Sequence, residues 1–291
     1  MPPILDFPVS DWNATFSAET QQEAMNGIET GNVLLFPQLP FVLEGNEKRF
    51  LTPDTVGKSK NVSYDLNTGV LRGTSLEGQD AEQLKGMIHR FASASRDLVF
   101  RLLPHYQQDI VCGRTSYRPV EIKGRASSWR KDDTRLHVDA FPSAPVQDKR
   151  LLRVFSNVNP NGDARVWRVG GAFEDIAKRF MPNIPGPMFG SSQLLQWLHI
   201  TKSRRSAYDH FMLQLHDSMK ADPDYQAKGE QITFNFQPGT TWMVFTDQVP
   251  HAVMSGQYLL EQTFYLPVSA MADPTRSPLQ VLERMTERSL T

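Results

Sequence analysis

The spacing of apolar residues differs between the first third of the chain and the remainder. A short apolar run, Asn32 to Phe36, has the length and composition of a strand. The segment from Ala81 to Leu103 repeats apolar residues at helical spacing, and Pro104 ends this helix because proline lacks an amide hydrogen. The first third therefore predicts a mixture of strands and helices.

From about Asp109 the chain changes to short runs rich in Val, Phe, Trp and Thr, separated by Gly, Pro, Asn and Asp. This pattern is typical of β-strands joined by turns, so residues 109–270 are predicted to form a β-barrel core. The clearest runs are Leu151 to Val158, Ala164 to Val169, Gln231 to Phe236, Thr240 to Phe245 and Tyr258 to Val268.

A helical insertion interrupts these strands at about residues 173–222. It contains Phe173 to Phe180 and Ser203 to Lys220, is too long for a hairpin loop, and is expected at one rim of the barrel. The apolar loop Met181 to Phe189 shows neither helix nor strand spacing. Without an internal repeat or a Gly/Ser linker, we expect one domain over residues 1–291. In this α+β, mostly β arrangement, residues 1–108 pack on the barrel and residues 271–291 form a C-terminal helix.

Composition narrows the class of protein. The chain of 291 residues has 40% hydrophobic and 22% charged residues, as ordinary globular proteins do. Its 31 basic residues balance 32 acidic ones, so no global positive field favours nucleic acid as a partner. Cys112 is the only cysteine, which excludes an intramolecular disulfide and indicates a reducing compartment, the cytoplasm. The sequence shows neither a signal-peptide pattern nor an apolar run of about 20 residues.

Three residues have the pattern of a metal site. His137 and Asp139 are two positions apart in LHVDAF, so an extended strand directs both side chains to one side. This spacing alone is common. It gains specificity from the later segment Pro238 to Val253, where a strand leads through a proline turn to His251, 114 positions after His137. Two imidazoles and one carboxylate on one face hold Fe(II) and leave coordination positions open, so these three residues are the predicted metal ligands and catalytic residues.

Through these residues the chain resembles the 2-oxoglutarate oxygenase superfamily. His137, Asp139 and His251 match its HxD...H pattern, and PGTTWMVFTDQVPHAV matches its barrel segment, so the likeness covers about residues 110–270. More narrowly, the whole chain is similar to bacterial Kdo hydroxylases in the segments SYRPVEIKGRASSWRKDDTRLHVDAFPSAP and RLLRVFSNVNP.

The resemblance implies a double-stranded β-helix, also called a jelly-roll or cupin-like barrel, with flanking helices. It also implies an Fe(II)- and 2-oxoglutarate-dependent dioxygenase that hydroxylates C3 of the Kdo sugar of Kdo-lipid A in lipopolysaccharide. O2 is the oxidant and ascorbate is a candidate reductant. An enzyme acting on this lipid-linked anionic sugar is expected in the cytoplasm, with peripheral contact at the inner face of the bacterial inner membrane.

The chain departs from the superfamily at the site of the co-substrate. An Arg or Lys commonly follows the last histidine on the next strand and pairs with the distal carboxylate of 2-oxoglutarate. Here that strand, YLLEQTFYLP, contains no cation. Arg153, a charge inside an apolar run, is the first candidate anchor, and Arg118, expected in a turn, is the second. Further candidates for the co-substrate site are Asn157, Gln262 and Thr263.

Arg153 and the other histidines also have a structural interpretation. Arg153 could instead pair with an acidic neighbour such as Asp148 or Glu174. The remaining histidines have no partner at metal spacing and are expected to be structural or solvated; they are His89, His105, His199, His210 and His216.

A basic stretch precedes the metal motif and suggests contacts with the substrate. A run of charges is usually a solvated face, but this one is close in sequence to the predicted iron site and could bind carboxylates and phosphates. Its candidate substrate-binding residues are Arg125, Arg130 and Lys131, with Lys123 beside them. Two alternatives stay open: an oxygenase for another small molecule or lipid, and a non-catalytic cupin-like barrel that binds sugar.

Overall fold

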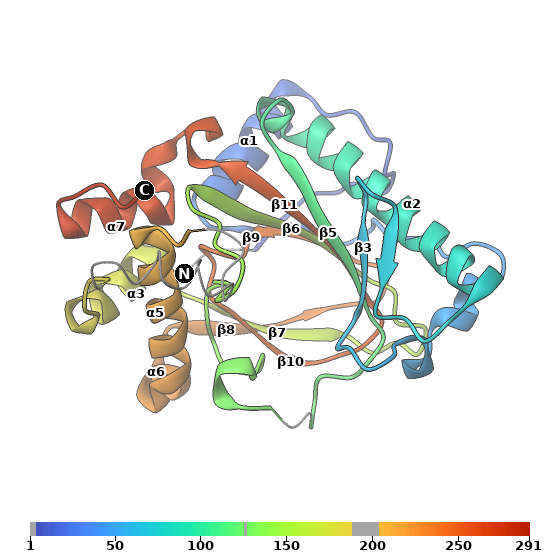
Figure 1. Cartoon of the computed structure of the whole chain (residues 1–291). Coiled ribbons are helices and arrows are strands. Elements are labelled where there is room, and N and C mark those ends of the chain that lie inside the picture. Colours follow the sequence, from blue (N-terminus) through green and yellow to red (C-terminus); the bar gives the residue numbers. More distant parts are fainter. Residues whose placement is uncertain (1–3, 125–126, 188–203) are drawn as a thin grey trace.

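The computed structural model describes residues 4–124, 127–187 and 204–291, and within them the strands form two sheets (Figure 1). Neighbouring strands are antiparallel except β1 and β2. The smaller sheet has the order β10 (His251–Ser255), β7 (Arg165–Gly170) and β8 (Gln231–Phe236). The larger sheet has the order β1 (Ile4–Asp6), β2 (Val33–Phe36), β9 (Thr241–Phe245), β6 (Lys149–Asn157), β11 (Leu259–Pro267), β5 (Val111–Arg118), β3 (Val62–Asp65) and β4 (Val70–Arg72).

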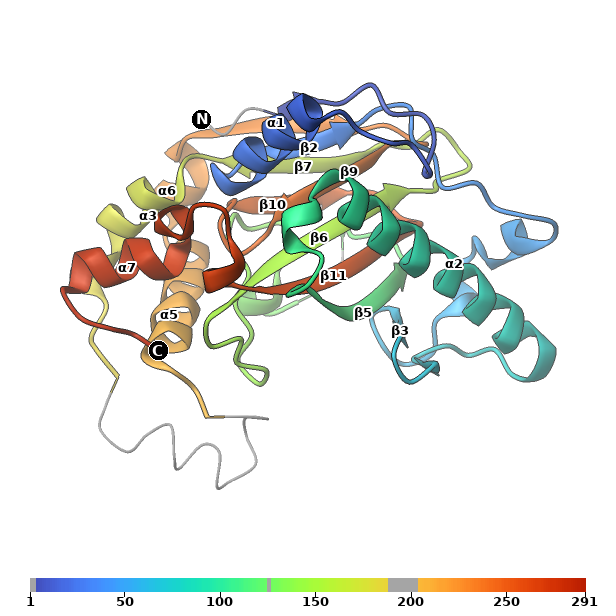
Figure 2. The same cartoon turned by 90° about the horizontal axis from the view of Figure 1, so that it is seen from above.

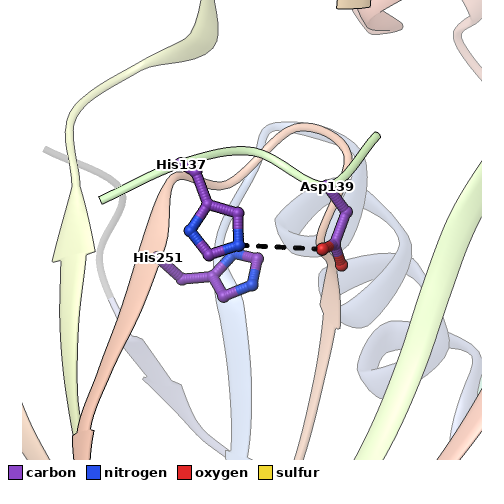
Figure 3. A group of neighbouring side chains, drawn as sticks. All are labelled: His137, Asp139 and His251. Carbon is purple, nitrogen blue, oxygen red and sulfur yellow. Dashed lines mark ion pairs between the residues drawn. The ribbon is translucent and has the colours of Figure 1, made fainter. Parts of the chain in front are cut away.

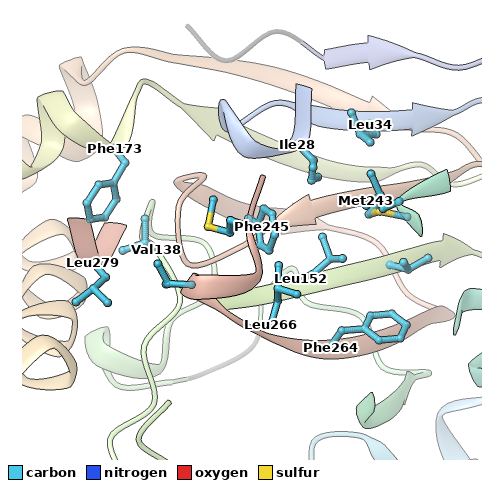
Figure 4. Close-up of a cluster of buried hydrophobic side chains, with 14 of the residues drawn as sticks. Ile28, Leu34, Val138, Leu152, Phe173, Met243, Phe245, Phe264, Leu266 and Leu279 are labelled. Carbon is cyan, nitrogen blue, oxygen red and sulfur yellow. The ribbon is translucent and has the colours of Figure 1, made fainter. Parts of the chain in front are cut away.

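The larger sheet is buried on both faces along β2 and β9, which explains why these two strands are almost continuously apolar. In β9, Trp242 and Val244 belong to the cluster between the two sheets, whereas Met243 and Phe245 belong to the cluster on the outer face. Successive strand residues point to opposite faces, so one strand supplies both clusters. Figure 4 shows the outer cluster, where Met243 and Phe245 lie near Leu152 of β6.

Two helices, α1 (Ala18–Glu29) and α2 (Gly78–Leu102), cover the outer face of the larger sheet (Figure 2). Ile28 of α1 and Leu102 of α2 pack in the outer cluster with β6 and β9. Farther along α2, Ile88 and Phe91 pack with Tyr117 of β5. The 3.6-residue period of α2 therefore buries one stripe of that helix along the sheet.

The remaining α-helices of the described residues gather at one end of the two sheets (Figure 1). They are α3 (Phe173–Phe180), α5 (Ala207–Ala221), α6 (Pro223–Lys228) and α7 (Pro278–Thr286). Helix α5 begins after Ser206, whose hydroxyl caps the amide of Asp209 while the Asp209 carboxylate accepts from the Ser206 amide. The expected start at Ser203 lies outside the described residues. None of the described helices has the length and hydropathy needed to cross a membrane.

The structure confirms the α+β class and each of the seven segments assigned above as strand or long helix, with shifts of at most three residues at their ends. It differs for the first third, whose strands do not pack on a separate barrel. Instead β2 pairs with β9, and β3 pairs with β5, so they extend the larger sheet. The apolar loop contains a 3₁₀ turn at Met181–Asn183, and its last two residues lie outside the described ranges.

Candidate metal and co-substrate site

The two histidines of the predicted triad are paired through their main chains. The amide of His137 donates to the carbonyl of His251 at 3.1 Å, and the amide of His251 donates to the carbonyl of His137 at 2.8 Å. The expected strand around His137 is therefore an extended segment with one bridge to the smaller sheet. Strand β9 ends at Phe245, and a turn leads from it to His251, which begins β10.

Apolar neighbours fix the direction of the HxD side chains. Leu136 and Val138 are fully buried in the outer cluster, so alternation along the extended chain turns His137 and Asp139 the other way. The Asp139 amide donates to the carbonyl of Thr246 at 2.8 Å. The short motif is thus fixed to the chain just after β9 and to the start of β10.

One potential ligand atom from each residue of the triad lies within 4.8 Å of the others (Figure 3). The Nε2 atom of His137 is 3.9 Å from Oδ1 of Asp139. The Nδ1 atoms face main-chain carbonyls, of Arg135 at 2.7 Å for His137 and of Val249 at 2.9 Å for His251. A carbonyl only accepts, so each Nδ1 carries the proton and each Nε2 lone pair is free for a metal.

Electrostatics keeps the ligands in the form that a metal requires. Burial and the neighbouring His251 hold the pKa of His137 well below its usual value. Burial also lowers the pKa of His251. For Asp139, burial raises the pKa, but the guanidinium of Arg153 lowers it by more, so the net pKa is well below the usual range. At neutral pH both rings are therefore neutral and the carboxylate is charged.

Acidification is expected to destabilise the metal-free protein below about pH 6.5. The folded-state pKa values of His137 and His251 lie below the unfolded value of 6.5, so the unfolded chain binds more protons as pH falls. Each ring contributes at most about 1.4 kcal/mol per pH unit. Urea unfolding at pH 7.5, 6.5 and 5.5 measures this loss, and His137→Asn should remove about half of it. If His137→Asn lost stability with falling pH as steeply as the wild type does, His137 would not be a source of the acid sensitivity.

A buried ion pair joins β6 to the turn that leads to His251. The Nε atom of Arg150 is 2.6 Å from the Asp247 carboxylate, and both side chains are almost fully buried. A second nitrogen of Arg150 donates to the side chain of Gln248 at 2.7 Å, and its guanidinium lies 4.0 Å from the centre of the Phe245 ring. These contacts hold residues 245–248 in place before the metal ligand.

The triad borders a cavity of about 190 Å³ between the two sheets. Three guanidinium groups and three carboxylates line the cavity, so their formal charges cancel while both histidines are neutral. Aromatic and aliphatic side chains form the rest of its wall. The charged lining residues are Arg118, Arg153, Arg165, Asp133, Asp139 and Glu261.

The structure places both predicted co-substrate anchors in this cavity. Arg153 is 3.3 Å from the carboxylates of Asp139 and Glu261, which are its acidic partners in place of the expected Asp148 or Glu174. Arg118 contacts Glu261 at 2.8 Å and ends β5, so the expected turn at that residue was wrong. Burial raises the pKa of Glu261, but Arg118 and Arg153 lower it more, leaving a net decrease.

Arg165 is a third cation that the sequence interpretation missed. Its Nη1 atom donates to the carbonyl of Gly256 at 2.6 Å, but its Nε atom is buried without a hydrogen-bond partner. Burial and the nearby Arg118 lower the pKa of Arg165 to about 9. Two positions along β7, Trp167 stacks on His251 and has an unpartnered indole N–H. Both residues lack the partners that an anionic ligand could supply.

The other predicted co-substrate residues occupy different surroundings. Thr263 is opposite Arg153 in the strand register and shares the cavity face. Gln262 points to the outer face, where it accepts from Thr115 at 2.5 Å, so it cannot face the cavity as expected. The side-chain amide nitrogen of Asn157 donates to the carbonyls of Asp163 and Phe236, which leaves this side chain in a structural role at the strand end.

His216 lies against the metal group although no sequence signal indicated it. Its ring meets the ring of His137 edge-on, with centroids 5.2 Å apart, and its Nδ1 atom is 2.9 Å from Asp217. Asp217 also pairs with Arg130 at 2.9 Å. Helix α5 therefore links the basic segment to the metal group.

The basic segment lies outside the wall of the cavity. Arg130 and Lys131 belong to the 3₁₀ turn Trp129–Lys131, and Arg130 is largely exposed above the Trp129 ring. Arg125 lies outside the described residues. The buried Lys220 of α5 donates to the carbonyl of Arg130 at 3.0 Å, so the turn is fixed to the helix.

The sequence profile of the 3-deoxy-D-manno-oct-2-ulosonic acid (Kdo) hydroxylases matches residues 11–289. The chain belongs to this family. The crystal structure of the Kdo hydroxylase KdoO, a non-heme Fe(II) alphaketoglutarate dependent dioxygenase, in complex with cobalt(II) shares 47% sequence identity with it. That match has a TM-score of 0.97 and covers 100% of this chain and 97% of that chain.

Two further KdoO structures agree closely with this chain. The complex with alphaketoglutarate and Fe(III) has a TM-score of 0.97 and 47% identity, over 99% of this chain and 97% of that one. The complex with succinate and Fe(III) has a TM-score of 0.96 and 46% identity, over 100% and 97%. No curated protein matches the chain. Membership of the family thus rests on a profile and on near-complete structural superposition.

Proposed function

We propose that the chain is an Fe(II)- and 2-oxoglutarate-dependent dioxygenase that hydroxylates C3 of the Kdo sugar of Kdo-lipid A. The observation that carries the proposal is the group of three potential ligand atoms within 4.8 Å on the wall of a charged cavity. The relatives named KdoO bind iron, alphaketoglutarate and succinate in their crystal structures. Two facing sheets around this group are consistent with a double-stranded β-helix over residues 109–270, within one domain.

His137, Asp139 and His251 would hold the iron. Their donor set of two imidazole nitrogens and one carboxylate is the one that non-haem Fe(II) oxygenases use, and it leaves room for further ligands. Bound iron with 2-oxoglutarate supplies the oxidising chemistry that activates O2, with ascorbate as a candidate reductant. The protein contributes neutral rings held by carbonyls, a charged Asp139 beside Arg153, and a cavity enclosed between two sheets.

The charges of the cavity fit a dicarboxylate co-substrate. The formal charges of the lining residues cancel in the absence of a metal. A bound divalent cation would add two positive charges, and a dianion would neutralise them. Arg165 is the best placed anchor, because it has no carboxylate partner among the described residues, unlike Arg118 and Arg153, and its buried Nε atom has no hydrogen-bond partner. Arg153 and Arg118 complete the anion site, although Glu261 already shares both of them.

Replacing Arg165 with glutamine is expected to raise the KM for 2-oxoglutarate by about tenfold to a hundredfold, because a charged hydrogen bond contributes roughly 1.5–3 kcal/mol. The KM for the sugar substrate should change little. Initial rates of succinate formation at varied 2-oxoglutarate measure the effect. Arg114→Gln, an exposed cation on β5, is the matched control. An unchanged KM in Arg165→Gln would assign the anchor to Arg153 or Arg118.

The basic segment is the part of the chain that we propose to contact the substrate. Arg130 and Lys131, with Lys123 and Arg125, are proposed to bind the carboxylate and phosphate groups of Kdo-lipid A. Contact with the inner face of the inner membrane belongs to the same proposal, because this substrate is a membrane lipid. Support comes from the link of Arg130 through Asp217 to His216, which lies against the metal group.

The direct test is incubation of the protein with Kdo-containing lipid A, Fe(II) and 2-oxoglutarate, followed by mass spectrometry. The expected product carries one added oxygen on the Kdo sugar and forms with one equivalent of succinate. Succinate formation without oxygen gain would refute the substrate while supporting the metal site. Absence of both succinate and oxygen gain from iron-loaded protein would refute the enzymatic function.

A further inference from the structure

A second, larger groove of about 680 Å³ lies between helices α3, α5 and α7 and the 3₁₀ turn at Met181–Asn183. It shares no lining residue with the cavity beside the triad. Figures 1 and 2 show that these three helices lie together at one end of the sheets. The groove is therefore a separate feature that the proposed reaction chemistry does not use.

Apolar side chains form the floor of this groove. Phe211 of α5 and Val281 of α7 are buried and continue into the outer cluster. Met181, Ile184 and Met285 are only partly buried and pack on the same cluster from the solvent side. Partly buried apolar side chains gathered in a concave surface favour a hydrocarbon ligand.

Cations surround this floor. The guanidinium of Arg288 lies 5.5 Å from the Phe211 ring and has no ion pair among the described residues. Arg284 donates to the carbonyl of Thr275 at 2.8 Å and likewise has no carboxylate partner in the described chain. Lys178 is already paired with Glu174 at 3.1 Å. Two guanidinium groups thus remain available for an anion beside an apolar floor.

Helix α5 separates the groove from the metal group. Phe211 borders the groove, whereas His216, five residues later, contacts His137. Five residues of helix correspond to a rotation of about 140° and a rise of about 7.5 Å, so the two side chains leave different sides of the helix. A ligand in the groove would lie roughly one helix diameter, about 10–12 Å, from the metal ligands.

We propose that this groove binds an acyl chain of an anionic membrane lipid, and that Arg284 and Arg288 contact the charged headgroup. An apolar floor with an unpaired cationic rim matches the two parts of such a lipid. The inference rests on the proposed function only in that a lipid-linked sugar explains why the enzyme would need to contact a membrane.

Sedimentation with phosphatidylglycerol vesicles, compared with phosphatidylcholine vesicles, tests the proposal on the full chain. The wild type should bind the anionic vesicles selectively. Arg284→Gln/Arg288→Gln should lower that binding about thirtyfold, since each cation near an anionic surface is worth about a fivefold change. Met285→Gln should also weaken binding, because it places an amide on the apolar floor. The control, Arg49→Gln/Lys85→Gln, removes the same charge near and on α2 and should bind as the wild type does.

Four outcomes would overturn the proposal. If the wild type does not bind anionic vesicles, it has no lipid site. If the control variant loses as much vesicle binding as Arg284→Gln/Arg288→Gln, the loss is a general effect of charge. A change in sedimentation coefficient with Met285→Gln would make the groove an interface between copies of the chain. Binding that appears only after deletion of residues 188–203 would show that the chain itself fills the groove. Vesicle binding needs no turnover, so these results are independent of the oxygenase test.

Discussion

Alanine at position 139 is expected to lower succinate formation by at least about a thousandfold while the protein stays folded. Asp139 is the only carboxylate of the metal group, and two histidines alone do not hold iron in the geometry that the reaction needs. A thousandfold loss corresponds to about 4 kcal/mol of lost transition-state stabilisation. Succinate release at saturating 2-oxoglutarate and iron content after desalting are the two measurements.

The matched control is Asp133→Ala, because Asp133 lines the same cavity outside the metal group. It should retain full iron content. The fold of Asp139→Ala should survive, since Arg153 keeps its second partner, Glu261, at 3.3 Å. Wild-type turnover in Asp139→Ala, or equal loss of iron in Asp133→Ala, would contradict the ligand assignment.

Replacing Arg150 with methionine should lower the free energy of unfolding by about 3–5 kcal/mol. The change leaves the charge of Asp247 buried without its partner, which costs far more than the net stabilisation that the pair provides. It also removes the contact with Gln248. Urea unfolding of the metal-free protein measures the loss.

A double-variant cycle separates the pair from the packing around it. Arg150→Met/Asp247→Leu should be more stable than Arg150→Met alone, because no buried charge remains. Arg179→Met, which breaks the exposed pair with Asp222, should cost less than about 1 kcal/mol. If Arg150→Met were as mild as Arg179→Met, the buried pair would not support the turn before His251.

The metal group could be predicted because the directions of its ligands are set locally, although the bridge that brings His137 to His251 is a long-range contact. Alternation of Leu136 and Val138 with His137 and Asp139 sets the direction of two ligands, and the turn before His251 sets the third. The same alternation also places Arg165 on the buried face of its strand. Arg165 shares a strand face with Trp167. Like Arg153, it is a charged residue on a largely apolar strand.

Other parts of the site depend on contacts that spacing cannot supply. Gln262 and Thr263 are adjacent in a strand, so only one of them can face the cavity, and the register with β6 decides that it is Thr263. His216 reaches His137 because helix α5 packs against an extended segment 79 residues earlier in the chain. The way β2 and β3 extend the larger sheet is likewise set by tertiary pairing.

The ion pair between Arg153 and Asp139 is expected to couple metal binding to co-substrate binding. If Asp139 held a metal, its charge would be shared with the metal, and Arg153 would be freer to bind a dicarboxylate. By linkage, the dicarboxylate must strengthen metal binding by the same factor. Titrating 2-oxoglutarate with and without a divalent metal, and the metal with and without 2-oxoglutarate, should therefore give one shared coupling constant, and Arg153→Met should reduce it.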